Sequence, residues 1–395
     1  MYSFKSVSRV CSVSISASRH FSSHKGKLRN VITVDNPYTG AVHCEVPQSS
    51  LEDSVKLLSL CDKAQKEYWG ETRSSVMSRQ STVVDYIQSL KGMETDFVKE
   101  ITESMGKPLH QAINEFNTMI ERAEALLDMS SVALDDEQLS SEPNMKRILR
   151  KEALGTVLII APWNYPLLCS INSIIPAILA GNSILFKMSS RTPIISELFA
   201  KATQDLDLPK HFITPIHCDH DVTSAVEYSR IFKKFLALLY IYIYLYLIKD
   251  PKVGFVVFTG SVAGGKQIQS AVSTRFINCT LELGGKDPAY VCDDSDIEKS
   301  AFTIVDGAVY NAGQSCCAVE RCYVHEKVAK KFLECCVENF KLLKLGDPND
   351  ESTTVGPMAT PSAPQFLQSQ VRIYKYKYKY IHICVYMSIC DQLHW

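Results

Sequence analysis

The sequence has little net charge, because 42 Lys and Arg residues almost balance 43 Asp and Glu residues over 395 positions. A formal charge of −1 gives no electrostatic case for a nucleic acid or an anionic membrane as a partner. The 14 cysteines form no CxxC pair and no Cys/His cluster at metal-ligand spacing, and no secretory signal opens the chain. We therefore expect reduced thiols, no disulfide framework and no metal site.

One apolar run, FLALLYIYIYLYLI at 235–248, has fourteen residues, whereas a membrane-spanning helix needs about 20. This run and the tail after Val371, which contains KYKYKY, are low-complexity sequence rich in Tyr, Ile, Leu and Lys. We interpret the insert at about 232–248 and the tail at 372–395 as translated non-coding sequence, and we expect the insert to form an exposed apolar patch. The alternatives are a membrane hairpin for the insert and a basic-aromatic nucleic-acid patch for the tail.

Acidic residues are absent before Asp35, whereas six Lys and Arg residues and many serines lie within residues 1–29. This composition is typical of a mitochondrial presequence. We therefore expect a mitochondrial matrix location rather than a cytoplasmic one. The alternative for this segment is a disordered cytosolic tail.

The length of 395 residues and the hydrophobic content of 46% allow a large core in two or more domains. NPYTG at 36–40 predicts a turn. From Leu51 to about Leu127 apolar residues recur at helical spacing, and Gly106-Lys107-Pro108 interrupts them. This pattern predicts a helical layer.

Strands and helices alternate after this layer. The predicted strands are 155–161, 183–187, 212–217 and 254–258, and the predicted helices are 166–180, with Gly181 at its C-terminal end, and 193–206. Such alternation predicts an α/β fold in which a parallel sheet carries helices on both faces.

The sequence contains no GxGxxG fingerprint, and GSVAGG at 260–265 is only a looser glycine loop before a helix. Nucleotide sites in parallel sheets nevertheless lie at the carboxyl ends of the strands. Asn164, Lys187 and Ser261 all fall at such ends. The alternatives are a solvated surface lysine for Lys187 and a turn or helix-cap residue for Asn164.

Two short strings, LELGGK at 281–286 and GQSCC at 313–317, pair a carboxylate with a thiol. A thiol that attacks a carbonyl carbon must become a thiolate or meet a base. Glu282 can be that base, and the glycines at 284 and 285 let a ligand or cofactor approach the backbone closely. Taken alone, a Gly-Gly beside a Glu is more often a turn, and a cysteine is more often a small buried apolar residue.

These strings follow others in a fixed order: APWNYP at 161–166, LFK at 185–187 and FTGS at 258–261. The set resembles the signature of the NAD(P)-dependent aldehyde dehydrogenase superfamily. The resemblance implies an α/β, aldehyde-dehydrogenase-like fold, with a Rossmann-type parallel-sheet cofactor domain at 30–281 and an incomplete α/β catalytic domain at 282–371.

The resemblance also implies the site residues. Cys316 would be the nucleophile, with Cys317 as the alternative. Glu282 would be the general base, and the Asn164 amide would stabilise the oxyanion together with a backbone N–H group. The cofactor contacts that it implies are Pro162, Trp163, Lys187, Ser190, Gly260, Ser261 and Gly284. The reaction would oxidise an aldehyde to a carboxylic acid through a thiohemiacetal and a thioester, with NAD or NADP as cofactor.

Ser190 stands where NAD-preferring members of this family commonly carry a glutamate. Because a carboxylate there repels a 2′-phosphate, its absence predicts that NADP is tolerated. We expect a small aldehyde as substrate, and the strings resemble the succinate-semialdehyde-like and broad-specificity branches without naming one aldehyde. We expect neither a nucleic acid nor a membrane as partner.

The resemblance stops near Val371, and Gly356-Pro357-Met358 is the last string that matches. Family members continue with a glutamate that holds the nicotinamide ribose and with a segment that crosses between the subunits of homodimers or homotetramers. We therefore expect this chain to lack the C-terminal oligomerisation segment and, as written, not to turn over aldehydes. The alternatives to an active hydrolytic enzyme are a catalytically inactive truncated isoform, a faulty gene model, or an acylating aldehyde dehydrogenase.

Overall fold

The computed structural model describes residues 31–72, 75–140, 144–218, 243 and 246–377. The predicted presequence lies outside these residues. Of the predicted insert and tail, only 243, 246–248 and 372–377 lie within them.

The described chain begins with an antiparallel hairpin of β1 (Val31–Asp35) and β2 (Val42–Pro47). The predicted turn between them is confirmed. The Asn36 Oδ1 atom accepts hydrogen bonds from the backbone N–H groups of Tyr38 and Thr39, at 2.9 and 3.0 Å. Gly40 ends the turn with a φ of 71°, in the left-handed region that glycine adopts without steric cost.

The main sheet has five strands in the order β7-β6-β5-β8-β9, and every pair is parallel. The strands are β5 (Thr156–Ala161), β6 (Ser183–Met188), β7 (Ile213–Pro215), β8 (Val253–Thr259) and β9 (Cys279–Glu282). β5 and β6 are buried at every position, which explains why their sequences are nearly continuous apolar runs. The predicted α/β parallel sheet is confirmed, and β9 is an additional strand that the sequence patterns did not predict.

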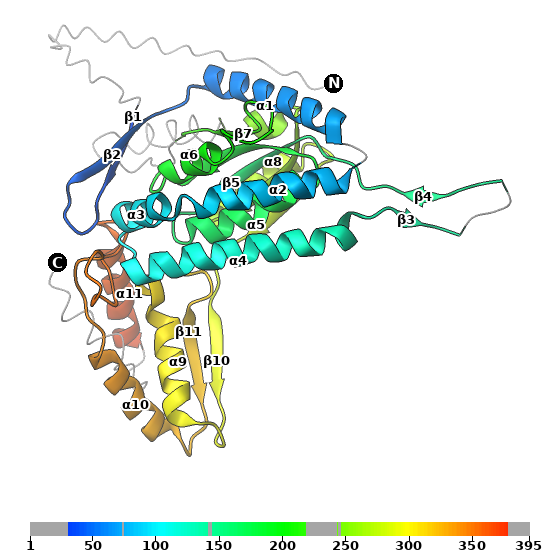
Figure 1. Cartoon of the computed structure of the whole chain (residues 1–395). Coiled ribbons are helices and arrows are strands. Elements are labelled where there is room, and N and C mark those ends of the chain that lie inside the picture. Colours follow the sequence, from blue (N-terminus) through cyan, green and yellow to red (C-terminus); the bar gives the residue numbers. More distant parts are fainter. Residues whose placement is uncertain (1–30, 73–74, 141–143, 219–242, 244–245, 378–395) are drawn as a thin grey trace, which may run out of the picture. The chain divides into compact units, whose positions relative to one another are not determined.

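Helices cover both faces of the main sheet (Figure 1). They are α1 (Leu51–Thr72), α2 (Val76–Lys91), α3 (Glu94–Met105), α4 (Leu109–Leu134), α5 (Pro166–Leu179), α6 (Ile194–Lys201) and α8 (Val262–Val272). The face that contains Val157 and Ile159 packs against α2 to α6, and the face that contains Leu158 and Ile160 packs against α8 and the first half of α1. Successive residues of β5 therefore enter two different cores.

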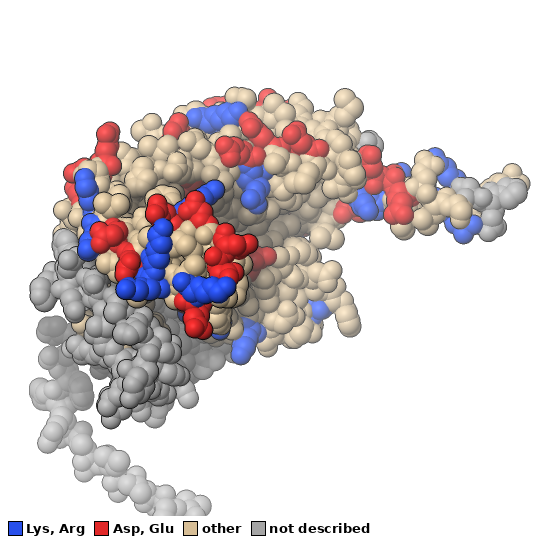
Figure 2. Space-filling model, turned by 90° about the horizontal axis from the view of Figure 1, so that it is seen from below, with Lys and Arg blue, Asp and Glu red and all other residues tan. Residues whose placement is uncertain are grey.

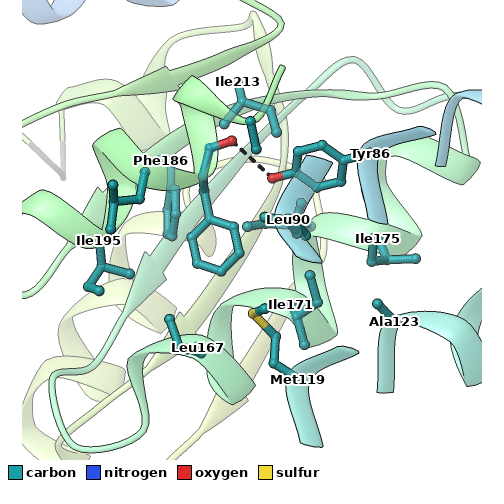
Figure 3. Close-up of a cluster of buried hydrophobic side chains, with 14 of the residues drawn as sticks. Tyr86, Leu90, Met119, Ala123, Leu167, Ile171, Ile175, Phe186, Ile195 and Ile213 are labelled. Atoms are coloured by element: carbon teal, nitrogen blue, oxygen red, sulfur yellow. Dashed lines mark hydrogen bonds between the residues drawn. The ribbon is translucent and has the colours of Figure 1, made fainter. Parts of the chain in front are cut away.

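The larger core lies between β5, β6 and the helices α2 to α6. Figure 3 shows its centre, where Leu90 of α2, Met119 of α4 and Ile171 of α5 meet Phe186 of β6. The Tyr86 hydroxyl is buried there and donates a hydrogen bond of 3.0 Å to the Phe199 carbonyl oxygen, which satisfies its one polar group.

The predicted helical layer is confirmed, including its interruption. α3 ends at Met105, Gly106 adopts a left-handed φ of 77°, and α4 begins at Leu109. The helix predicted for 193–206 is shorter, because α6 ends at Lys201. Beyond it, the N–H groups of Thr203 and Gln204 bond to carbonyl groups three residues back, which is the pattern of tight turns.

A small sheet follows the main one in sequence. Its two strands, β10 (Asp287–Val291) and β11 (Val319–Val324), are parallel and are connected through α9 (Ile297–Val309) and the 3₁₀ turn η2 (Tyr310–Gly313). α10 (Ala329–Lys341) packs on α9, and their shared core is the cluster of Val291, Ile297, Ala301, Val305, Phe332 and Cys336. The remaining elements are α11 (Ala363–Lys377), β3 (Glu137–Gln138) and β4 (Ile148–Leu149).

Leu247 and Ile248, at the end of the predicted insert, are fully buried in the core beneath β8. These two residues therefore do not belong to an exposed apolar patch, contrary to the expectation for the insert. Among the described helices, none combines the length and the hydropathy needed to cross a membrane. On the face seen in Figure 2, acidic and basic side chains are interspersed.

Candidate active site

The carboxyl ends of the main-sheet strands share one edge, because all the strands run in the same direction. Most of the predicted site residues lie at this edge. Pro162, Trp163 and Asn164 follow β5, Lys187 and Ser190 lie at and just after the end of β6, Gly260 and Ser261 follow β8, and Glu282 and Gly284 lie at and after the end of β9. The structure thus places every predicted cofactor residue along one edge.

Lys187 is 0% exposed and lies in β6 opposite Ile160 of β5. The alternative of a solvated surface lysine is therefore wrong. Trp163 is partly buried and packs against the larger core, whereas Ser190 is half-buried at the edge. The indole of Trp163 therefore contributes to the core as well as to the edge.

The glycine loop after β8 is shaped by Phe258. A Cβ atom at Gly260 or Gly264 would come within 2.8 or 2.7 Å of the Phe258 ring, so neither position accepts a side chain without rearrangement. Ser261 caps α8, since its Oγ atom accepts a 3.1 Å hydrogen bond from the Gly264 N–H group. The Gly260 N–H group donates to the Glu282 carbonyl oxygen at 2.9 Å, which ties the ends of β8 and β9 together.

The loop that carries the thiols begins with an unusual backbone. Asn311, Ala312 and Gly313 have successive φ values of 55°, 56° and 72°, all in the left-handed region. A residue other than glycine in this region costs about 1–3 kcal/mol and persists only where its surroundings hold it. Asn311 is 1% exposed, and its N–H group donates to the Gln111 Oε1 atom of α4 at 3.0 Å. The strained turn is therefore anchored on the other side of the site.

The strings LELGGK and GQSCC meet at Gly285. A Cβ atom on Gly285 would overlap the Cys316 carbonyl oxygen and lie 2.8 Å from the Asp287 Oδ1 atom. The prediction that both glycines admit a ligand is wrong for Gly285, because the backbone of Cys316 occupies the space beside it. Around Gly284, by contrast, no described atom lies within 4 Å of a Cβ position. Gly284 is thus the glycine that leaves room for a ligand.

Asn164 reaches the thiol loop through its side chain. Its Nδ2 atom donates to the Gln314 carbonyl oxygen at 3.1 Å, two residues before Cys316. The residue that caps α5 is Tyr165, so the alternative of a helix-cap role for Asn164 is wrong. An amide group has two N–H donors, and one hydrogen bond to Gln314 leaves the other for a ligand.

The thiol of Cys316 is not activated by its own surroundings. Partial burial raises its pKa, and the neighbouring Cys317 raises it further. The protonated thiol therefore predominates near neutral pH, and its proton must leave before or as the sulfur attacks. Cys316 and Cys317 are both exposed, and the Cys317 Sγ atom lies 3.2 Å from the Ser315 Oγ atom, so the choice of Cys316 as nucleophile stays a prediction. The Glu282 side chain is also exposed.

Cys169, on α5, is a site residue that the sequence argument missed. Burial raises its pKa to about 12, and the charges of Glu115, Cys316 and Glu282 raise it as well. Cys169 therefore lies within electrostatic reach of both the candidate nucleophile and the candidate base. Its only sequence signal is its position five residues after Asn164.

Lys107 and Glu115 were also missed, because Gly-Lys-Pro was interpreted only as a helix break. They form an ion pair whose side chains are 0% and 1% exposed. The Lys107 Nζ atom also donates to the Asn164 carbonyl oxygen at 2.9 Å. Gly356 packs against the Gly106 carbonyl group, so the last matching string of the sequence contacts the segment that carries Lys107.

The fold and the site together define an α/β protein that presents a cysteine loop at the carboxyl edge of a parallel sheet. The model of the aldehyde dehydrogenase family matches residues 23–232 and 243–382, and the chain belongs to this family. The match is interrupted at 233–242, inside the predicted insert, and resumes at 243. The match continues to residue 382, so the expectation that the resemblance stops near Val371 is wrong, and residues 372–382 of the predicted tail lie inside the family match.

Curated relatives support the same assignment. The chain is 30% identical over 324 residues to succinate semialdehyde dehydrogenase [NAD(P)+] Sad of Escherichia coli (strain K12), covering 82% of this chain and 65% of that protein. It is 28% identical over 339 residues to D-glyceraldehyde dehydrogenase (NADP(+)) of Picrophilus torridus, covering 86% of this chain and 64% of that protein. The chain thus spans slightly less than two thirds of the length of these relatives.

Solved structures show the same fold. A 3,6-anhydro-L-galactose dehydrogenase in complex with NAP superposes with a TM-score of 0.75 at 25% identity, covering 87% of this chain and 67% of that chain. Apo betaine aldehyde dehydrogenase from Staphylococcus aureus gives a TM-score of 0.78 at 24% identity, covering 88% and 65%. The second comparison supports the fold alone.

Proposed function

We propose that this chain carries the site of an NAD(P)-dependent aldehyde dehydrogenase that converts an aldehyde and water to a carboxylic acid. The observation that carries the proposal is the packing of Gly285 against Cys316, which joins the carboxylate-bearing strand end to the thiol loop. Asn164 is hydrogen-bonded to the same loop. These contacts support the proposal that Cys316 as nucleophile, Glu282 as base and Asn164 as amide donor act together at this edge of the sheet.

In the proposed reaction the Cys316 thiol releases its proton to solvent, and the sulfur attacks the aldehyde carbon and forms a thiohemiacetal. The second N–H of the Asn164 amide and a backbone N–H group stabilise the negative charge that develops on the aldehyde oxygen. NAD(P), when bound, supplies the acceptor for the hydride that leaves this carbon. Glu282 then takes a proton from the water that attacks the resulting thioester, so that the acid leaves and Cys316 is regenerated.

The edge fits a dinucleotide in two respects. The first turn of α8 presents backbone N–H groups next to the Ser261 cap, an arrangement that favours phosphate. Gly284 leaves open space at the end of β9. Ser190 offers a hydroxyl group where a glutamate would exclude a 2′-phosphate, and this supports the use of NADP as well as NAD. The relatives named above for NAD(P)+ and NADP(+) agree with this choice.

The substrate class that we propose is a small aldehyde, since the relatives are named for succinate semialdehyde and D-glyceraldehyde. We keep the mitochondrial matrix as the proposed location on the composition of residues 1–29 alone. We favour hydrolysis of the thioester over transfer of the acyl group to a thiol, because in this proposal Glu282 activates water.

A catalytically inactive form, which is what the sequence predicts for the chain as written, is the second candidate. It is favoured by the small sheet, which has two strands among the described residues and exposes Tyr290 and Tyr323 to 66% and 54%. To distinguish the two candidates, the full chain is incubated with propanal and with NAD or NADP. Absorbance of NAD(P)H measures turnover, and mass analysis measures modification of Cys316. Aldehyde-dependent NAD(P)H with acylated Cys316 supports the enzyme, and reversible aldehyde protection of Cys316 without NAD(P)H supports the inactive form. An aldehyde that neither protects nor modifies Cys316 contradicts the proposal.

A further inference from the structure

A buried polar network lies directly against the backbone of Asn164. The Lys107 Nζ atom contacts the Glu115 carboxylate, donates to the Asn164 carbonyl oxygen at 2.9 Å, and lies 4.1 Å from the centre of the Tyr165 ring. Three interactions of different kinds thus hold one ammonium group. Two of them are made to the residue proposed to stabilise the oxyanion and to its immediate neighbour.

Glu115 fixes the other end of the same loop. Its Oε1 atom accepts hydrogen bonds from the backbone N–H groups of Leu167 and Leu168, at 2.9 and 3.4 Å. These groups belong to the first turn of α5. Tyr165 is the N-cap residue of this helix, and within the described part of the chain its side chain makes no capping hydrogen bond. A carboxylate from α4 therefore replaces the missing cap and faces the positive end of the α5 dipole.

The network continues into the thiol loop. The Asn164 carbonyl oxygen accepts a second hydrogen bond, of 2.9 Å, from the Asn311 side-chain amide, and Gln111 accepts from the Asn311 backbone. A carbonyl oxygen has two lone pairs, so Lys107 and Asn311 together saturate it. Burial raises the pKa of Tyr165, and Ser315, next to Cys316, opposes this effect.

The energetics suggest that this network does more than stabilise the fold. Removing one partner of a buried ion pair is strongly destabilising, whereas replacing both partners by neutral groups of similar volume is often close to neutral. A buried ion pair is therefore weak evidence for a stabilising role. Its contacts with the Asn164 segment, and through Asn164 with the thiol loop, are better explained if the pair positions these segments. Asn164 needs such support because it lies in an irregular segment between β5 and α5.

We propose that Lys107 and Glu115 are positioning residues that hold the Asn164 amide in register with Cys316. This inference rests on the proposed function, since it assigns a cause to the placement of the proposed oxyanion donor. Neither residue touches the aldehyde. Their effect is transmitted through the Asn164 carbonyl oxygen and the first turn of α5.

The test uses the full chain with the double variant Lys107→Met/Glu115→Gln, which removes both charges at similar volume. Its matched control is Lys91→Met/Glu124→Gln, which removes an exposed ion pair of 2.7 Å between α2 and α4. Thermal unfolding reports the fold, and alkylation of Cys316 by iodoacetamide reports the thiol. Protection of Cys316 by propanal, followed by peptide mass analysis, reports thiohemiacetal formation without requiring turnover.

We expect the double variant to unfold near the wild-type temperature and to be alkylated at a rate within about twofold of it. The propanal concentration for half-protection should rise by about tenfold or more, and kcat should fall by about 10²-fold with KM changed much less, as for loss of an oxyanion donor. The control should match the wild type in every measurement. Unchanged protection and kcat in a folded double variant would overturn the proposal.

A double-mutant cycle separates positioning from a general structural effect. In an Asn164→Ala background, where the amide is already absent, Lys107→Met/Glu115→Gln should weaken protection by less than about twofold further. Losses that multiply in the combined variant would show that the ion pair acts independently of Asn164 and would overturn the proposal. If propanal fails to protect wild-type Cys316, the proposed function itself fails, a result distinct from the other two.

Discussion

The main sheet and the small sheet each supply part of the site, but they are built very differently. β5 and β6 are buried at every position, and helices cover both faces of the main sheet. In the small sheet, β11 has no fully buried position and β10 has one, Val291. The edge residues of the main sheet are thus fixed by a large core, whereas the small sheet offers the thiol loop little support of its own.

The thiol loop obtains its support from outside the small sheet. Asn311 is held by Gln111 of α4, and the Gln314 Oε1 atom accepts a 2.9 Å hydrogen bond from the backbone N–H of Ala359. Gly285 packs against the Cys316 carbonyl group. The position of Cys316, the proposed nucleophile, therefore depends on contacts with segments distant in sequence rather than on its own sheet.

The largest effect is expected for Cys316→Ala, which removes the reactive group on the small-sheet side. Acyl-enzyme formation should fall below detection, a loss of more than about 10³-fold, while NAD(P) binding measured by fluorescence titration stays near normal. Cys317→Ala is the matched control and should retain most of the activity. An active Cys316→Ala variant together with an inactive Cys317→Ala variant would identify Cys317 as the nucleophile.

Glu282→Gln replaces the proposed general base, which lies at the end of a main-sheet strand, by a neutral amide. The first hydride transfer should proceed, and hydrolysis of the thioester should slow by about 10²-fold or more. Rapid mixing of enzyme, aldehyde and NAD(P) should therefore show a burst of NAD(P)H followed by a slow phase. Loss of the burst itself would mean that Glu282 is needed to activate the thiol.

Gly285→Ala tests the contact between the two regions directly. The new methyl group would overlap the Cys316 carbonyl oxygen, and we expect the free energy of unfolding to fall by about 2 kcal/mol. Gly70→Ala in α1 is the control, because no described atom lies within 4 Å of its Cβ position. The control should be neutral or more stable by up to about 1 kcal/mol in urea titrations. Equal stability of Gly285→Ala and the control would disprove the tight packing.

The smallest effect concerns His43, which lies on β2, far in sequence from either sheet. The Glu100 carboxylate, 2.9 Å away, raises the pKa of His43 above 6.5 despite partial burial. Protonated His43 therefore stabilises the fold below about pH 6.5, and this contribution is lost as the pH rises through the raised pKa. His43→Gln should be less stable than the wild type at about pH 5.5 and nearly equal to it at about pH 8.5. A difference that is independent of pH would contradict this assignment.

The main sheet could be predicted from the sequence because strands buried on both faces have nearly continuous apolar sequences. β5 and β6 need apolar residues at almost every position, and such runs are visible without any knowledge of contacts. Asn164, Lys187 and Ser261 followed from the same pattern, since the ends of their strands could be located, whereas the other edge residues came from the family resemblance. β9 was missed because only four residues pair and their burial alternates.

The contacts that organise the thiol loop could not be predicted from local patterns. The need for glycine at 285 arises from the backbone of Cys316, thirty-one residues later in the sequence. Lys107 follows a left-handed glycine, and its sequence context indicates only a break between helices. Its ion pair with Glu115 and its bond to Asn164 depend on the relative placement of α4 and α5.

The most direct test of the account is the site of acylation in a single turnover. The full chain, mixed with propanal and NAD or NADP and quenched in acid, is digested, and the peptide that contains Cys316 and Cys317 is fragmented by mass spectrometry. The account predicts a propanoyl group on the Cys316 sulfur that accumulates further in Glu282→Gln. A propanoyl group on Cys317, or no acylated cysteine while NAD(P)H is formed, would contradict it.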